Sequence, residues 1–460
     1  MLKKTCHLII ILTLSGCSLA PDYEKPETVI DHPVELKTGS TTDRYSFHDL
    51  FAADKPLLDL LEHALNNNYD LQQAMQRVIA ARASTMSSVF DLVPGVKLSS
   101  SKSTSMSSGT NLITGATIQS KTENYQSAVG VDSYEVDIWG KKINQVQALK
   151  YDGLNYESVA AALHLTLMSD LASNWYETLY MIKVWHLLND KKNKLDQIQK
   201  KLNALEDAGQ IDVVIMSKFL RGRASDDSNL RNLQREIINR IHKLEFLSGY
   251  RSPWLNTSDW QKISGNYQVP SLPQRITSEV IFNRPDVIAA EMKIKSANGS
   301  IGAARAAFLP VFNLYASAWH TSDDFGHILS NLSENWTFTP SIVLPVFNWP
   351  KNYANLNYAR SQQVITVIEY RKTVAQALMD IQDATNNLAG YQHLYSAAGV
   401  EVAQHRENFV KLDARYAAGY ADLYGYYEAV DLAFTAEMEL ESNRQQMMAY
   451  TVTLLKAIGG

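Results

Sequence analysis

Two long stretches without proline constrain the fold of this chain more than any other feature. The first runs from Gly140 to Ser252, with Gly209 near its middle, and the second covers the residues after Pro350. Because proline breaks helices, each stretch has room for very long ones. In the first stretch apolar residues recur every seven positions on both sides of the glycine, at Leu188, Leu195, Leu202, Leu230, Ile237 and Leu244. This spacing predicts two helices that pack along a coiled-coil seam and are joined by a tight turn.

The second half of the chain repeats the first. With an offset of 210 residues, Trp349 falls on Trp139 and Gly419 falls on Gly209. Each copy is expected to contain a helix, two strands and a long helical hairpin, and such a repeat fixes the architecture. The expected parts are a first repeat over residues 57–250, a linker over 251–275 and a second repeat over 276–460.

The segments before the hairpins are expected to form one helix and two strands in each copy. Apolar spacing predicts the first helix from Leu57 to Leu92. In the second copy, alternating apolar and polar residues around Trp336 and Phe338 suit a strand with one face toward lipid and one toward water. A soluble two-sided sheet is the alternative. The serine-rich tract Ser99–Thr117 could be either a strand or a disordered loop.

Four strands per chain are too few to enclose water, since even small closed barrels need about eight. An open sheet in lipid would leave unpaired edges, which hydrocarbon does not tolerate. If these strands span a membrane, the chain must therefore form an oligomer.

The N-terminus predicts export and lipid attachment. Two lysines precede the short apolar run Leu8–Leu14, as in a secretory signal peptide, here expected over residues 1–16. Leu14-Ser15-Gly16-Cys17 resembles the lipobox of bacterial lipoproteins, which implies cleavage before Cys17 and acylation of it, including with palmitate. A simple signal peptide with a chance cysteine is the alternative. Residues 17–56 would then form a lipid-anchored tether, and Ser18 favours sorting to the outer membrane.

Composition excludes several functions. The net charge is −5 without a basic block, so nucleic acid is not an expected partner. No apolar run approaches the roughly 20 residues of a transmembrane helix. The sequence contains no phosphate-binding loop, paired metal-ligand motif or cysteine nucleophile. We expect no catalytic residue, no metal and no cofactor, and hence no enzyme.

Several motifs together resemble the TolC-like outer-membrane efflux proteins, in particular the lipidated OprM/NodT branch. They stand in the family's order at residues 14–23, 134–141, 283–287, 301–310 and 415–419. The resemblance implies a mixed α and β fold with duplicated coiled-coil hairpins and four membrane β-strands per chain. A homotrimer would form a β-barrel continued by an α-helical barrel.

The same resemblance implies a function. The chain would be the outer-membrane channel of a tripartite efflux system, a passive trimeric duct carrying small toxic compounds from the periplasm to the exterior. Its partners would be a periplasmic adaptor protein, an inner-membrane pump of the RND type, and outer-membrane lipid. It would be anchored in the outer membrane and extend into the periplasm. A duct for protein secretion and a lipid-anchored periplasmic coiled-coil scaffold are the alternatives.

Family members carry acidic residues just after the second hairpin turn, where they narrow the tunnel mouth. Glu428 matches one such position, but Gly425 occupies the other. Solvated residues at a helix end are the alternative. The resemblance implies a periplasmic gate and a set of adaptor contacts at the hairpin tips. The gate candidates are Glu428, Asp422 and Tyr424, and the candidate adaptor contacts are Gly209, Asp212, Gly419 and Tyr420.

Overall fold

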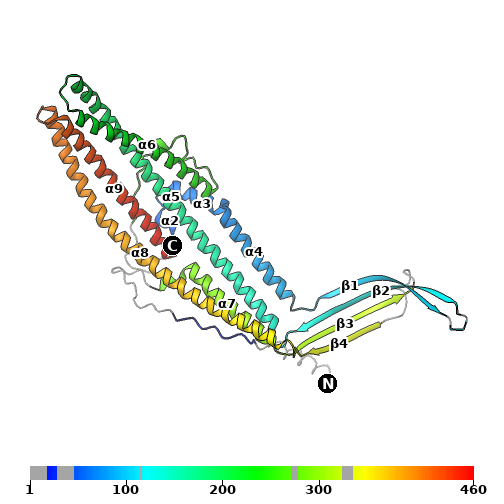
Figure 1. The fold of residues 1–460 in the computed structure, drawn as a ribbon. Coiled ribbons are helices and arrows are strands. Elements are labelled where there is room, and N and C mark those ends of the chain that lie inside the picture. Colours follow the sequence, from blue (N-terminus) through cyan, green and yellow to red (C-terminus); the bar gives the residue numbers. More distant parts are fainter. Residues whose placement is uncertain are drawn as a thin grey trace. The chain divides into compact units, whose positions relative to one another are not determined.

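The computed structural model describes residues 18–27, 46–110, 112–113, 115–270, 278–323 and 335–459 (Figure 1). Cys17, the predicted signal peptide and much of the predicted tether lie outside these ranges. The chain divides into two compact units. Among the described residues, one unit contains 18–27, 77–156 and 289–370 without the gap at 324–334, and the other contains 46–76, 157–270, 278–288 and 371–459.

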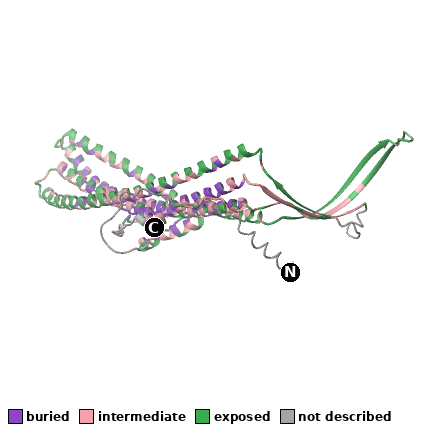
Figure 2. Ribbon diagram, turned by 90° about the horizontal axis from the view of Figure 1, so that it is seen from below, coloured by how far each residue is buried: buried purple, intermediate pink, exposed green. Residues whose placement is uncertain are grey.

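The two predicted helical hairpins are confirmed. The first consists of α5 (Lys141–Asp207) and α6 (Val213–Ser248), and the second of α8 (Trp349–Ala417) and α9 (Leu423–Ala457). Leu195 and Ile237 of the predicted seam are at most 1% exposed. Figure 2 shows buried residues gathered along these helices. Burial of one apolar stripe per helix therefore stabilises the rods, as the heptad spacing requires.

The helix predicted from Leu57 to Leu92 is two helices, α3 (Lys55–Asn67) and α4 (Tyr69–Phe90). Asn68 between them adopts an extended backbone conformation. Its side-chain oxygen accepts a hydrogen bond from the Leu71 amide at 3.0 Å, and its side-chain amide donates to the Leu247 carbonyl at 2.9 Å. Asparagine offers the backbone a local alternative to the helix, and here that alternative caps α4.

The remaining helical elements are short or lie before the second pair of strands. They are α2 (Phe47–Leu50), α7 (Pro285–Ala306) and the 3₁₀ turns η1 (Trp260–Lys262) and η2 (Ser278–Asn283). Arg284, directly before α7, is buried, and its guanidinium donates to Asp286, to Asp380 of α8 and to the Ala457 carbonyl of α9. This arginine ties the start of the second repeat to both helices of its hairpin.

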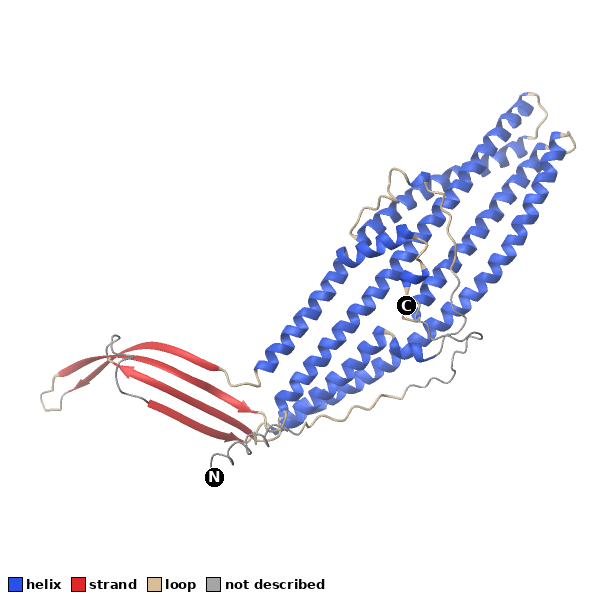
Figure 3. Ribbon diagram, turned by 180° about the vertical axis from the view of Figure 1, so that it is seen from behind, coloured by secondary structure: helices blue, strands red, loops and turns tan. Residues whose placement is uncertain are grey.

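Four strands form one antiparallel sheet in the order β1-β2-β3-β4 (Figure 3). They are β1 (Val96–Thr110), β2 (Thr117–Val136), β3 (Val311–Ser322) and β4 (Asn335–Val343). The tract Ser99–Thr117, left open between strand and loop, is strand over most of its length. Neither β1 nor β4 has a second neighbour among the described residues, so both long edges of the sheet are unpaired.

The register places apolar side chains on one face of the sheet. Val96, Val131, Ala316 and Phe338 lie across from one another, and so do Leu98, Val129, Ala318 and Trp336. Successive strand residues alternate between faces, so these two rows share one side. Leu98 is 85% exposed and Trp336 is 75% exposed. We call this side of the sheet the apolar face.

The opposite side, which we call the polar face, carries mainly serine, threonine and amide side chains, together with Lys97, Asp132, Tyr315 and Trp319. A shallow cavity on it is lined by residues of this face from all four strands, including Ser101, Gln126, Ser317 and Thr337. The two faces therefore differ in polarity in the half of the sheet next to the helices, where the apolar rows lie, although both are solvent-accessible in the single chain.

A β-bulge keeps the apolar face continuous along β2. The register shifts between Val131 and Tyr134, and Ser133 adopts a positive φ of 41°. Val131 and Val136 are five residues apart, so regular alternation would place them on opposite faces. The extra residue in the bulge returns Val136 to the same face as Val131, opposite Phe312.

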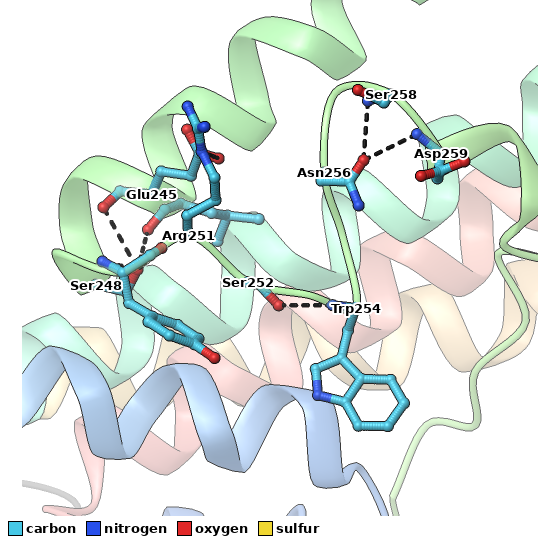
Figure 4. Close-up of polar contacts among 10 residues, drawn as sticks. Glu245, Ser248, Arg251, Ser252, Trp254, Asn256, Ser258 and Asp259 are labelled. Carbon is cyan, nitrogen blue, oxygen red and sulfur yellow. Dashed lines mark hydrogen bonds and ion pairs between the residues drawn. The ribbon is translucent and has the colours of Figure 1, made fainter.

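The described part of the linker after α6 is folded against the helices. The Asn256 side chain accepts hydrogen bonds from the Ser258 and Asp259 amides, both at 2.9 Å, and forms a tight turn (Figure 4). Trp260 directly after this turn is 2% exposed and belongs to the core of its unit. The turn thus places the Trp260 side chain in the helical core.

Candidate functional site at the hairpin tips

The two hairpin turns have the same backbone structure. Gly209 and Gly419 adopt φ values of +68° and +77°, which favour glycine. The next amide in each turn donates back to the helix at 2.8 Å, from Gln210 to the Leu205 carbonyl and from Tyr420 to the Arg415 carbonyl. This is the glycine-dependent motif that ends many helices. The repeat inferred from sequence therefore extends to the geometry of the tips.

Asp212 and Asp422 cap the helices that follow the turns. The Asp212 carboxylate accepts from the Val214 amide at 2.7 Å, and the Asp422 carboxylate accepts from the Gly425 amide at 2.8 Å. Aspartate at this position satisfies free amides and complements the helix dipole. Both side chains thus have a structural role, and a further role of Asp422 at a gate stays a prediction.

Glu428 and Tyr424 lie one turn apart on α9 and interact. Glu428 is exposed. The Tyr424 hydroxyl donates a hydrogen bond to Glu428, and this bond raises the pKa of the tyrosine. Lys218 of α6 lies 6.0 Å above the Tyr424 ring. With the offset of 210, Lys218 is the first-copy equivalent of Glu428, so the two tips present opposite charges at matching positions.

The other aromatic residues near the second turn are packed. The rings of Tyr416 and Tyr426 stack with centroids 5.0 Å apart, and Lys201 of α5 lies 4.6 Å above Tyr416. Burial and a hydrogen bond to Asp413 raise the pKa of Tyr426 to about 12. Tyr427 packs edge-on against buried Phe219 of α6, with centroids 5.1 Å apart. These contacts join the second hairpin to the first.

Tyr420, in contrast, is 80% exposed at the apex of the second turn. In the first turn Val213 and Val214 are 73% and 59% exposed. Exposed apolar groups at both apices suit contact with another protein. The role of Gly209, Gly419 and Tyr420 in such a contact stays a prediction.

Sequence reasoning missed Lys191, which is buried between the two hairpins. Its side chain is 4% exposed, and its ammonium group contacts Asp226 of α6 at 2.8 Å and Asp431 of α9 at 2.6 Å. Burial disfavours the charged ammonium, but hydrogen bonds and charge interactions with both carboxylates outweigh this and raise the pKa of Lys191. One lysine of α5 thus holds both α6 and α9.

The sequence contained a signal for this site. Lys191 lies three residues after Leu188 and four before Leu195, so it occupies a seam position of the heptad pattern. A charged residue in a seam requires partners of opposite charge. The helices α6 and α9 also approach closely near this lysine. A Cβ atom added at Gly222 of α6 would collide with the Tyr427 hydroxyl of α9.

The described residues contain no group of His, Cys, Asp or Glu side chains that could hold a metal ion. No helix among the described residues is long and apolar enough to cross a membrane.

The sequence pattern of the family described as Outer membrane efflux protein matches residues 60–249 and 276–460. The chain belongs to this family. The matched ranges contain both hairpins, all four strands and the tips. The chain is accordingly an outer-membrane efflux channel protein, and the family and the outer-membrane location predicted from its motifs are confirmed. The predicted lipid anchor and the chain's place in the lipidated branch stay predictions.

This outer membrane efflux protein is similar over nearly its whole length to known members. It is 27% identical to the toluene efflux pump outer membrane protein TtgC of Pseudomonas putida, over 97% of this chain and 93% of that protein. It is 26% identical to the cation efflux system protein CusC of Escherichia coli, over 99% of both. The crystal structure of the open state of the Neisseria gonorrhoeae MtrE outer membrane channel matches with a TM-score of 0.83. That match has 25% identity and covers 96% of this chain and 98% of that chain. These relatives are channel proteins rather than enzymes, and the predicted mixed α and β fold is confirmed.

Proposed function

We propose that three copies of this chain form a passive duct through the outer membrane for a tripartite efflux system. The observation that carries the proposal is a sheet with one apolar face and two unpaired edges. In lipid, unpaired strand edges are strongly unfavourable, so β1 of one copy would pair with β4 of the next. Three copies would close a barrel of about twelve strands, enough to enclose water. The apolar face would then contact lipid and the polar face the lumen.

The helices next to the two edge strands support the same arrangement. α4 leads into β1 and carries the exposed apolar residues Met86 and Phe90, while α8 follows β4 and carries exposed Val364 and Ile368. If β1 pairs with β4 of the next copy, α4 of one copy comes next to α8 of another. Burying these side chains between copies would then stabilise the trimer at about 25 cal/mol per Å² of apolar surface.

Cargo and partners follow from the class of protein. The two relatives described above are named for toluene and for cations. Both relatives match this chain over nearly its whole length although they are named for different cargoes, so selection between cargoes would belong to an inner-membrane pump of the RND type. A periplasmic adaptor would contact the hairpin tips, where Tyr420 and Val213 are exposed. The exported compounds would be small and toxic.

The segment after Cys17 supports a lipid anchor near the start of the sheet. The Ser18 hydroxyl donates to Asn144 in the first turn of α5 at 2.7 Å, and Arg305 near the end of α7 donates to the Leu19 carbonyl at 2.9 Å. Both helices adjoin strands, so Ser18 and Leu19 would lie close to the membrane surface. Metabolic labelling with palmitate should mark the wild type and not Cys17→Ser. Equal labelling of both would refute acylation at Cys17.

Reconstitution into planar bilayers tests the duct and its gate. The wild type should give steady single-channel conductance with a preference for cations, which a periplasmic scaffold would not. Glu428→Gln removes a ring of three carboxylates, so we expect the permeability ratio of K⁺ to Cl⁻ to fall severalfold. Glu439→Gln, an equal charge loss at an exposed site further along α9, is the control. An unchanged ratio in Glu428→Gln would dismiss the gate role.

A further inference from the structure

In the half of the β1–β2 hairpin that lies farther from the helices, the charged residues all lie on one side of the sheet. Over Ser99–Thr110 and Thr117–Ala128 these are Lys102, Lys121 and Glu123. Lys102 pairs in register with Tyr125, Met106 with Lys121 and Thr104 with Glu123, which places all three charges on the apolar face. The polar face of the same two segments contains no Asp, Glu, Lys, Arg or His. If these charges served only to keep the hairpin hydrated, they would not need to be confined to one face of the sheet.

These charges begin where the apolar rows end. The last apolar row contains Leu98, Val129 and Trp336. The next row on this face contains Ser100, Ser127 and His320, and Lys102 follows it. At about 3.3 Å per strand residue, Lys102 lies roughly 13 Å beyond Leu98, on the side away from the strand ends that join the helices. If the sheet inserts in the membrane as proposed above, Lys102 lies at the extracellular edge of the lipid-facing surface of the sheet.

The cluster has an excess positive charge and free donor capacity. The Lys102 and Lys121 ammonium groups contact the same Glu123 carboxylate at 2.8 Å and 2.6 Å. Lys102 also lies 5.0 Å above the Tyr125 ring. Their side chains remain 45% and 59% exposed. Each ammonium has three donors, so both can bind a further anionic acceptor while keeping the shared carboxylate.

We propose that Lys102 and Lys121 bind the phosphate groups of an anionic glycolipid in the outer leaflet. This inference rests on the proposed insertion of the sheet in the outer membrane. A phosphorylated headgroup at the end of the acyl-chain region fits because it would meet two cations and an aromatic ring one polar row beyond the apolar rows. Glu123 holds the two ammonium groups close together and partly offsets their charge. A cargo molecule in the lumen would face the opposite side of the sheet.

Lipid binding can be measured with the full-length protein in phosphatidylcholine nanodiscs. Native mass spectrometry with added bis-phosphorylated lipid A should show bound lipid on the wild type. Lys102→Gln and Lys121→Gln should each weaken binding about fivefold, and the double variant more. Lys97→Gln is the matched control, because Lys97 lies on the polar face of the same strand and is also ion-paired, with Asp132 at 2.7 Å. It should bind lipid A like the wild type.

Glu123→Gln separates binding from a purely structural ion-pair role. Loss of the shared carboxylate frees both ammonium groups, so lipid A binding should become tighter. Dephosphorylated lipid A should bind the wild type as weakly as it binds the double variant, and millimolar inorganic phosphate should not compete. Equal binding by the wild type and the double lysine variant would overturn the proposal. Conductance of the same preparations distinguishes that outcome from failure of the proposed duct, since the variants should still conduct.

Discussion

Replacing Lys191 with methionine should loosen the packing between the two hairpins near their tips. Methionine is an unbranched side chain one atom shorter than lysine, and the substitution leaves Asp226 and Asp431 without their shared cation. Loss of one partner of a buried ion pair is strongly destabilising, because the remaining charges stay desolvated. The Asp431 side chain is 43% exposed, so water relieves part of this effect. We expect a loss of about 2–3 kcal/mol for the contact between the hairpins.

The adjacent lysine provides a matched control. Lys192 pairs with Asp227 at 3.2 Å, but both side chains are at least 30% exposed. Lys192→Met should therefore cost less than about 1 kcal/mol. Hydrogen exchange of the amides in α6 and α9, with thermal unfolding of the purified protein, measures both effects. Adding Asp226→Asn and Asp431→Asn to Lys191→Met should restore most of the protection, since no unpaired charge then remains. Equal protection in Lys191→Met and Lys192→Met would contradict the role of the buried cation.

The two repeats differ at this site. The position equivalent to Lys191 in the second hairpin is Glu401, and the position equivalent to Asp226 is Ala436. The buried cation therefore belongs to the first hairpin alone and binds the second through Asp431. If the duct opens by separation of the hairpins at their tips, this contact opposes the movement, and Lys191→Met should also raise the basal conductance.

Long-range architecture was predictable because periodicity and internal duplication report it directly. Seven-residue spacing from Leu188 to Leu202 specified the seam, and the common offset of Gly209 and Gly419 specified the second hairpin. The heptad spacing and the repeat reflect packing within one chain, so they can be read from one sequence without knowledge of other subunits. The break at Asn68 was missed because apolar spacing continues across it, whereas the helix ends through the extended backbone of Asn68 and the hydrogen bonds of its side chain to Leu71 and Leu247.

The faces of the sheet and the Lys191 contact needed the structure. In Ser99–Thr110 serine and threonine occupy both sides of the strand, so alternation is weak and the register alone assigns the faces. The bulge at Ser133 also reverses the expected side of every residue after it in β2. Lys191 was recognisable as a seam position, but its partners lie 35 and 240 residues away in the sequence. Pairing over such distances is set by the arrangement of three helices.

Introducing arginine at Phe338 should prevent insertion of the sheet into the outer membrane. Phe338 is 57% exposed and lies in the row of Val96, Val131 and Ala316, within the apolar face. Arginine on the lipid-facing side of a membrane strand costs about 2–4 kcal/mol near the bilayer midplane. A trimer would carry three such charges. We expect Phe338→Arg to be lost from the outer-membrane fraction and to show no trimer after chemical crosslinking.

Thr337→Arg places the same charge one residue away on the polar face, opposite Ser317. Water in the lumen would hydrate this arginine, so the variant should insert and form trimers like the wild type. Its permeability should shift toward anions, because three added cations would line the pore. Membrane fractionation, crosslinking and bilayer conductance of the two variants together decide the orientation of the sheet. Normal insertion of Phe338→Arg with failure of Thr337→Arg would mean that the faces are reversed, since a single-residue step along a strand changes the environment from lipid to water.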